Sequence, residues 1–529
     1  MSHRCEGVPR RIPPWGLAVV AGLTAAPLWA GRFLPFLDLP QHLGLASVIH
    51  HYGDPAWDFQ RFYEVDARPL PYWGYYLPVS LLMSLLPVEI ASKVVLSVAL
   101  GLVPVGLWSL LGAFRRDRRL ALFGVPLAWN TNLYMGFTSF VVSIPLYLFA
   151  VAAAERYLSG PAGRRGRAAA AGALALAVYL AHGQTFLLLV CSVGLLWLAH
   201  RAPGRHLLAY LPSALLLAYW IATVVAAPPA EVASPEHLHV FERLGVPGRV
   251  RFNPPSANLA RLSEALFAVH SGEVEEGLWL ALGGVFVALS FFRATAVAPE
   301  GRGIRSWLHR WRAELLAAAV LLAYFVTPME VGLQWYVNPR FLVFGALLAV
   351  LWLGPEPLLA WRGCLLWPLA ALALAILVYD GVQIRRFQAE VQGFETVLAA
   401  ASRGGRTLGL IYDLGAGRPV RTWPFLHFAG YLQAHKGGDL GFSFAGLPSI
   451  PVRYKAGRQA PHPYEWQPQQ FRWALHGRYY QRILVRGRPR GDARQLASRA
   501  SRVVTAPGWA LYEFDTFQEK SAPASGAIP

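Results

Sequence analysis

Charge and cysteine are scarce in this chain of 529 residues. Charged residues make up 15% of it against 55% hydrophobic residues, and the mean hydropathy is +0.36. So few charges cannot cover the surface of a soluble protein of this size. Cys5, Cys191 and Cys364 are too few and too scattered to indicate a disulfide framework or a cysteine-bound metal. The composition therefore predicts an integral membrane protein without redox chemistry.

Nucleotide-binding and cofactor-binding motifs are missing as well. No Walker loop, dinucleotide fingerprint, zinc motif or serine elbow stands in a context that would support it. We therefore expect neither a nucleotide-driven pump nor a resident cofactor. A divalent cation bound by histidine and aspartate is the alternative that stays open.

What the sequence has instead is a series of apolar stretches separated by Arg, Pro or Gly. Each is about the length of the roughly 20-residue helix that crosses a bilayer. The pattern predicts an all-α multi-pass membrane bundle over residues 1–384. We expect 11 crossings, at residues 15–36, 88–114, 118–135, 137–157, 168–182, 184–199, 207–227, 276–292, 313–328, 338–354 and 363–380. Residues 168–199 could also form one long helix, although His-Gly-Gln at their centre favours a turn.

Arginine clusters set the expected orientation, because positively charged loops stay on the cytoplasmic side. Arg10 and Arg11 place the N-terminus inside, and an odd number of crossings places the C-terminus outside. A cleaved signal peptide is the alternative for residues 1–30. The protein is thus expected in the cytoplasmic (inner) membrane, with its function on the outer face.

Two long loops are expected on that outer face, residues 37–87 and 228–275. The apolar stretch from Tyr72 to Leu86 within the first loop is short. A crossing there would turn the basic cluster that begins at Arg115 outward. We therefore expect an interfacial or re-entrant helix in this stretch.

Residues 385–529 lack long apolar stretches and predict a separate, soluble, small α/β domain outside the membrane. This tail carries 20 Lys and Arg against 9 Asp and Glu, which is +11 of the formal +18 of the chain. A basic surface at this place favours membrane lipids with anionic headgroups, and no nucleic acid is expected. The final ten or so residues are expected to be disordered. The expected elements are helices at 390–401 and 424–434 and strands at 407–412, 480–485 and 510–514.

Asp38 is the first candidate catalytic residue. It stands in the sequence Asp-Leu-Pro-Gln-His, where the first crossing leaves the bilayer. In a partly desolvated cavity its carboxylate could act as a general base on an incoming hydroxyl. His42, one helical turn away, could share a proton with Asp38 or, with His50 or Asp54, bind a divalent cation. The alternative is that Asp38 caps the helix that starts at Pro40.

Arg340 is the leading candidate for binding a phosphate. The Asn-Pro pair directly before it predicts a helix start with asparagine as the N-cap. Free backbone N–H groups and the helix dipole favour an anion in such a first turn. The alternative is that Arg340 extends to the lipid headgroups. Lys93 and Arg68 are further candidates for the phosphate, and His182 is a candidate to line the cavity.

This layout resembles the GT-C superfamily of membrane glycosyltransferases, which includes protein O-mannosyltransferases and the aminoarabinose transferases of lipid A. The resemblance covers nearly the whole chain as architecture. Asp38 corresponds to the acidic residue that opens the first outer loop, although Leu39 and Pro40 follow where members often have a second acidic residue. The segments Tyr480-Gln-Arg-Ile-Leu-Val-Arg486 and Trp509-Ala-Leu-Tyr-Glu-Phe514 look like the closing strands of the outer domain.

The resemblance implies transfer of a hexosyl or pentosyl group from a polyprenyl-phosphate carrier to an acceptor at the outer face. Asp38 would act as the base or position the acceptor, and Arg340 would hold the lipid phosphate. The phosphate leaving group supplies the energy, so no ATP is needed. The competing hypotheses are a lipid or polysaccharide transporter and a GT-C-like scaffold without turnover. A transporter commonly has internal repeats and charges at the bilayer midplane, whereas here the ionisable groups gather at the outer ends.

Overall fold

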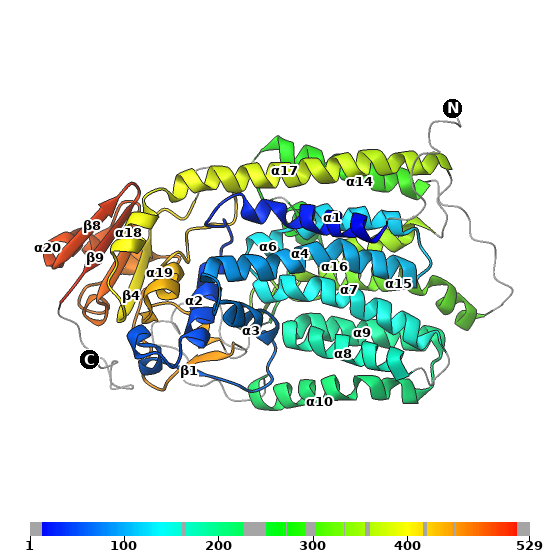
Figure 1. Cartoon of the computed structure of the whole chain (residues 1–529), viewed down its shortest axis with the longest axis horizontal. Coiled ribbons are helices and arrows are strands. Elements are labelled where there is room, and N and C mark those ends of the chain that lie inside the picture. Colours follow the sequence, from blue (N-terminus) through cyan, green and yellow to red (C-terminus); the bar gives the residue numbers. More distant parts are fainter. Residues whose placement is uncertain are drawn as a thin grey trace.

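The computed structural model describes residues 13–160, 165–225, 250–267, 269–270, 272–291, 303–332, 334–354, 360–415, 420–447 and 450–515. The basic N-terminal residues, much of the loop 228–275 and the tail residues expected to be disordered lie outside this part. In the described part, helices form a bundle and a mixed sheet lies at one end of it (Figure 1).

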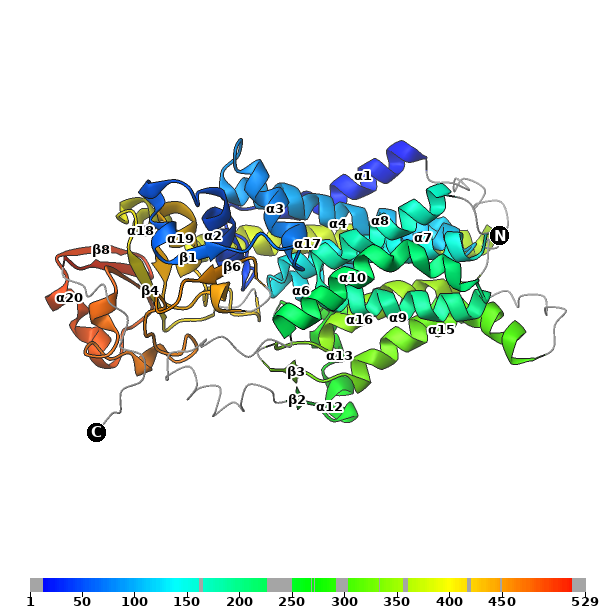
Figure 2. The same ribbon diagram turned by 90° about the horizontal axis from the view of Figure 1, so that it is seen from below.

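The bundle consists of apolar helices that lie side by side (Figures 1 and 2). Within the described residues, 6 helical stretches are long and apolar enough to cross a membrane: Val88–Ala113, Thr138–Leu158, Gly183–His200, Gly204–Thr223, Glu273–Phe291 and Gly363–Val391. The bundle helices are α1 (Pro14–Ala25), α4 (Val88–Ala113), α7 (Thr138–Leu158), α8 (Arg165–Ala181), α9 (Gly183–His200), α10 (Leu211–Trp220), α14 (Glu273–Phe291), α15 (Ile304–Val326), α16 (Pro339–Ala349) and α17 (Leu366–Val391). The predicted integral membrane protein is confirmed, with a described helix at each expected crossing except the third.

The third expected crossing is wrong as a continuous helix. Residues 118–135 instead form a 3₁₀ turn (Arg118–Phe123) and two short helices, α5 (Gly124–Ala128) and α6 (Thr131–Tyr134). The helix is interrupted at Asn130, whose backbone is extended and whose side chain accepts a hydrogen bond from the Asn132 N–H at 3.0 Å. Such a cap begins a new helix and ends the preceding one.

Other boundaries follow the predictions more closely. His182 is extended between α8 and α9, which confirms the turn expected there. The short stretch after Tyr72 forms α3 (Trp73–Leu82), whose 10 residues are too few to cross a bilayer. The three scattered cysteines did not indicate a disulfide, yet Cys364 is disulfide-bonded.

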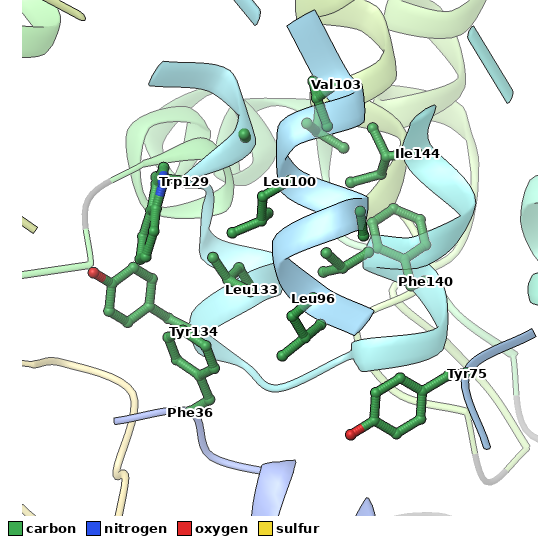
Figure 3. Packing of buried hydrophobic residues seen from close by; sticks show 14 of the residues in the cluster. Phe36, Tyr75, Leu96, Leu100, Val103, Trp129, Leu133, Tyr134, Phe140 and Ile144 are labelled. Atoms are coloured by element: carbon green, nitrogen blue, oxygen red, sulfur yellow. The ribbon is translucent and has the colours of Figure 1, made fainter. Parts of the chain in front are cut away.

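Leucine, valine and aromatic side chains fill the space between α4 and α7. Leu96, Leu100 and Val103 of α4 and Phe140 and Ile144 of α7 belong to one buried cluster, and all five are at most 1% exposed (Figure 3). Tight packing of this kind is what holds helices together where lipid replaces water. The turn where α6 and α7 meet lies at the end of the bundle next to the tail (Figure 1).

The tail forms a five-stranded sheet of order β5-β4-β7-β9-β8. β4 pairs parallel with β5 and β7, and the pairs β7–β9 and β8–β9 are antiparallel. The three predicted strands are β4, β7 and β9, whereas the exposed edge strand β8 was not predicted. The elements are α18 (Phe394–Ala400), β4 (Arg406–Ile411), α19 (Ala429–Lys436), β5 (Asp439–Leu440), β7 (Arg482–Arg486), α20 (Leu496–Arg499), β8 (Arg502–Ala506) and β9 (Trp509–Glu513).

The first outer loop is built into this tail. Its strand β1 (Tyr63–Val65) pairs antiparallel with β6 (Val452–Tyr454). Its helix α2 (Leu39–His50) packs against α19, as Figures 1 and 2 show. The outer end of the bundle also holds a small pair of strands, β2 (Val250–Arg251) and β3 (Glu330–Val331), and the helices α12 (Pro255–Ala260) and α13 (Leu262–Leu266).

Part of the basic charge of the tail is buried in its sheet. Arg482 is fully buried and donates to the backbone oxygens of Ser402 and Gly404. Arg406 is paired with Asp439 at 3.2 Å. These two arginines are buried and bonded inside the tail, so they do not belong to the basic surface that the composition predicts.

Candidate functional site

Asp38 lies where the bundle, the first loop and the tail meet. Its backbone N–H donates to Met135 O at 3.2 Å, and the Leu37 N–H donates to Tyr134 O at 2.9 Å. Gly136 completes this contact with a φ of 77°, and a Cβ on it would lie 2.5 Å from Asp38 N. Only glycine fits there without displacement. The α6–α7 turn therefore fixes the backbone of Asp38 against the bundle.

The side chain of Asp38 does not cap α2. The helix begins at Leu39, yet no hydrogen bond joins the Asp38 carboxylate to its first turn. The capping alternative is therefore wrong. The carboxylate is 12% exposed, and its Oδ1 lies 3.1 Å from Nδ1 of His427. This arrangement leaves lone pairs of a shielded carboxylate open to a ligand.

His42 lies beside Asp38, but its side-chain hydrogen bond is made with a different residue. Its Nδ1 is 2.6 Å from the hydroxyl of Tyr76. Burial lowers the pKa of His42 to about 4, although Asp38 acts in the opposite direction. The ring is therefore neutral near pH 7. It can take part in hydrogen bonding in the site but does not supply a positive charge.

Arg340 is buried in the bundle instead of reaching the lipid surface. It is the second residue of α16, and its guanidinium lies 4.3 Å from the ring centre of Phe137. Its hydrogen bonds are long, to Gln184 Oε1 and to Trp335 O, both at 3.4 Å. Its Nε has no partner in the described part of the chain. A buried cation with such weak partners fits an anionic ligand.

The start of α16 differs from the prediction in one respect. Asn338 does not cap the helix, because its amide donates to Tyr324 O at 2.9 Å and to Asn258 Oδ1 at 3.2 Å. It joins α16 to α15 instead. The first turn of α16 therefore has no side-chain cap, while the Phe341 N–H donates to Asn338 O at 3.1 Å.

Asp38 and Arg340 share one neighbourhood. The Asp38 carboxylate acts electrostatically on the guanidinium of Arg340, together with Tyr72 and Tyr336. Both tyrosines have a positive φ, 81° and 62°. Side chains rarely adopt this conformation, and packing must hold it at a cost of order 1–3 kcal/mol each. Backbone strain of this kind collects at functional sites.

His182 belongs to the same neighbourhood. Its ring meets the edges of Tyr72 and Phe140, each with ring centres 5.3 Å apart. Arg340 acts on it electrostatically, and its Nδ1 accepts from the Thr185 N–H at 3.4 Å, at the start of α9. His182 therefore lies near Arg340, as expected of a residue that lines the cavity.

Three predicted site residues are occupied elsewhere. Arg68 forms an ion pair with Asp66 at 2.6 Å. Lys93 donates to Gly31 O. Asp54 is exposed and accepts from the Ala56 N–H at 2.9 Å, which caps a 3₁₀ turn. The structure does not bring them to Asp38. Among the described residues, no group of three or more His, Cys, Asp or Glu could hold a metal ion.

Sequence reasoning missed two residues of this site, His427 and Glu465. Both come from the tail and act electrostatically on each other, and Asp38 also acts on Glu465. Burial raises the pKa of Glu465 to about 7, and its Oε2 has no partner among the described residues. The signal in the sequence was weak, because His427 is a single histidine among apolar residues at a predicted helix.

No protein-family model and no curated protein matches this chain in sequence. Solved structures do resemble it. ArnT from Cupriavidus metallidurans bound to undecaprenyl phosphate has 14% sequence identity and a TM-score of 0.52, over 94% of this chain and 96% of ArnT. Its apo state gives a TM-score of 0.50 over the same shares. The arabinofuranosyltransferase AftD from Mycobacteria has 14% identity and a TM-score of 0.43, over 91% of this chain and 35% of AftD.

The two ArnT comparisons show the fold. They confirm the expected architecture, a multi-pass helical membrane bundle with a small sheet-containing region at its C-terminal end.

Proposed function

We propose that this protein is a membrane glycosyltransferase that moves a sugar from a polyprenyl-phosphate carrier to an acceptor. The observation that carries the proposal is that two incompletely bonded buried groups, the Asp38 carboxylate and the Arg340 guanidinium, act on each other electrostatically at one end of the bundle. A neighbour in fold, ArnT, binds undecaprenyl phosphate, which supports a carrier of this class.

The chemistry needs a base and an anion-binding group. The acceptor hydroxyl loses its proton to Asp38, and its oxygen forms a bond to the anomeric carbon of the sugar. The bond from that carbon to the phosphate oxygen breaks, and its electron pair stays on the leaving polyprenyl phosphate. Arg340 stabilises the growing negative charge of the phosphate in a site from which aromatic side chains exclude water.

The direct test measures carrier binding and transfer separately. Purified protein in lipid nanodiscs is given labelled undecaprenyl phosphate for binding, and undecaprenyl-phosphate hexose or pentose with a membrane lipid extract for transfer. We expect Arg340→Gln to weaken binding of the carrier and Asp38→Asn to abolish transfer while binding is kept. Asp492→Asn, at an exposed position of the tail, is the matched control. Folded Asp38→Asn and Arg340→Gln proteins that transfer as fast as the parent would refute the proposal.

We also propose that the site faces the outer side of the cytoplasmic membrane, with the N-terminus inside. The arginine clusters of the short loops support this orientation. Reporter fusions at the N-terminus and after residue 515 test it. Activity of a cytoplasmic reporter at the C-terminal fusion would contradict the orientation but leave the chemistry of Asp38 and Arg340 intact.

A further inference from the structure

His427, a residue of the tail, is built into the site of Asp38. Its Nδ1 lies 3.1 Å from Asp38 Oδ1, and its side chain is 7% exposed. Both ring nitrogens are shielded from solvent, and neither has a hydrogen-bond partner in the described part of the chain. Buried polar atoms of proteins are nearly always bonded, so this ring is an exception that calls for an explanation.

Close helix packing brings His427 to this place. A Cβ on Gly430 would lie 2.4 Å from the backbone carbon of Pro40, and one on Gly44 would lie 2.4 Å from Oε1 of Gln433. Glycine at both positions lets α2 and α19 touch. The Gly430 N–H also donates to His427 O at 2.9 Å, so the contact fixes the turn that carries the histidine.

Aromatic rings, and not hydrogen bonds, hold the imidazole. It stacks on Phe442 at 5.3 Å with an angle of 17° and meets the edge of Phe444 at 5.5 Å. Gln41 of α2 holds this segment, since its amide donates to Phe442 O at 3.0 Å and accepts from the Phe444 N–H at 3.4 Å. The ring is therefore held in position, and the nitrogen that carries no hydrogen in the neutral form is available to accept a proton.

The titratable groups that act on the ring are Asp38, Glu465 and His42. Arg340 and Asp38 also act on each other electrostatically. His42 is neutral and bonded to Tyr76, so the two carboxyl groups determine the charge at the imidazole. Glu465 lies beside His427 with a shielded Oε2 that has no partner among the described residues. A negative charge on it favours the imidazolium.

We propose that His427 is a positioning residue that accepts the proton which Asp38 removes from the acceptor, and that Glu465 stabilises the imidazolium so formed. This inference rests on the proposed function. The acceptor proton moves to Asp38 and then to the neutral imidazole, so the carboxylate is restored while the leaving phosphate needs no proton. The bundle supplies the base and the tail supplies its proton acceptor, which makes the two regions one catalytic centre.

The test is the pH dependence of transfer in the full-length protein in nanodiscs. The proposed step needs a neutral imidazole to take up the proton, so we expect the transfer rate of the parent to rise with pH. In His427→Gln we expect kcat to fall about 100-fold with KM for the undecaprenyl-phosphate sugar unchanged, the low end of general acid–base contributions. The rising limb of the pH–rate profile should become shallower, because the imidazole no longer takes up the proton.

The controls separate this role from mere packing. Glu465→Gln keeps the ring but removes the negative charge, so we expect the rising limb to move to lower pH with a smaller loss of rate. His476→Gln replaces another buried histidine of the tail, whose Nδ1 accepts from the Arg472 N–H at 3.0 Å. It should lower the melting temperature at most and leave the pH profile unchanged.

Each outcome decides one proposal. Parental kcat and a parental pH profile in His427→Gln overturn the inference, and an unchanged profile in Glu465→Gln does so if the first variant does not fold. A parent without transfer, or an Asp38→Asn protein with parental transfer, overturns the proposed function instead.

Discussion

Two buried carboxylates of this protein differ in how fully they are bonded. Asp439 is inaccessible to solvent and accepts from Tyr63 at 2.6 Å, from Tyr454 at 3.1 Å and from Arg406 at 3.2 Å. Within the described residues, Asp38 has no comparable set of donors and makes an ion-pair contact with His427. Asp439 joins the first loop to the sheet of the tail, and its carboxylate oxygens are engaged by these donors. Asp38, by contrast, keeps hydrogen-bonding capacity for a substrate.

The partner arginines differ in the same way. Arg406 pairs with Asp439 and also donates to Arg458 O at 2.6 Å. In the part of the chain that the structure describes, the Arg340 guanidinium makes two hydrogen bonds, to Gln184 Oε1 and to Trp335 O, both at 3.4 Å. Burying a charge is costly unless it is paired and hydrogen-bonded. The comparison therefore distinguishes an ion pair that stabilises the fold from two charges that await a ligand.

The largest expected effect is on transfer in Asp38→Asn. Loss of the base should slow transfer by about 10²–10⁴-fold while the melting temperature stays close to that of the parent. The measurement is single-turnover transfer in nanodiscs alongside thermal unfolding. A large drop in melting temperature would mean that Asp38, like Asp439, is structural.

The counterpart is Asp439→Ala, which should act on stability. It leaves the buried Arg406 without its partner, and we expect a loss of about 3–5 kcal/mol in unfolding free energy. Chemical denaturation of the full chain in detergent, followed by tryptophan fluorescence, measures it. A loss no larger than that of the Asp38→Ala protein would contradict the distinction between the two carboxylates.

Gly430→Val tests the contact that joins the two regions. The new side chain would meet the backbone of Pro40, and overpacking of this kind costs roughly 1–3 kcal/mol. Transfer should also fall, because the turn that carries His427 moves away from Asp38. Gly194→Ala, in a position with nothing within 4 Å, is the matched control and should keep both properties. Parental transfer by Gly430→Val would show that the close contact is not needed.

A smaller effect is expected from Tyr63→Phe. It removes the 2.6 Å hydrogen bond to Asp439, while Tyr454 and Arg406 remain as donors. The net loss should be about 1 kcal/mol, measured by the same denaturation. A loss as large as that of Asp439→Ala would mean that the hydroxyl, and not the ion pair, dominates this cluster.

The smallest expected effect is a pH dependence of stability. Burial raises the pKa of Asp439 to about 6, against the opposing effects of Arg406, Tyr63 and Tyr454. A folded-state pKa above the unfolded value means that the folded protein binds the proton more tightly. The contribution of Asp439 to stability is therefore present below about pH 4 and lost as the pH rises towards 6. Asp439→Asn should remove this part of the slope in melting temperature between pH 4 and 7, and an unchanged slope would contradict the assignment.

Much of the fold could be predicted because its signals are local. Apolar stretches of membrane-spanning length placed the bundle helices, and alternating apolar residues placed β4, β7 and β9 within two residues. The prediction of the third crossing failed because Asn130 interrupts the helix inside an apolar stretch, and hydropathy does not detect a helix cap. The edge strand β8 was not predicted, because its exposed residues give no apolar pattern.

The site was predicted in part for the same reason. Asp38 and Arg340 could be found from their places at the ends of apolar segments. Arg68, Lys93 and Asp54 have similar places, but they are bonded to local partners that hydropathy does not reveal.

The sequence alone determined that this chain is a membrane bundle with a mixed α/β tail, and that a carboxylate stands at the C-terminal end of its first apolar segment. Only the tertiary structure decided which distant groups surround that carboxylate. His427 and Glu465 reach it because glycines let α2 and α19 touch and because β1 pairs with β6. Contacts between segments hundreds of residues apart depend on side-chain packing across the whole chain, and no periodicity within one segment encodes them.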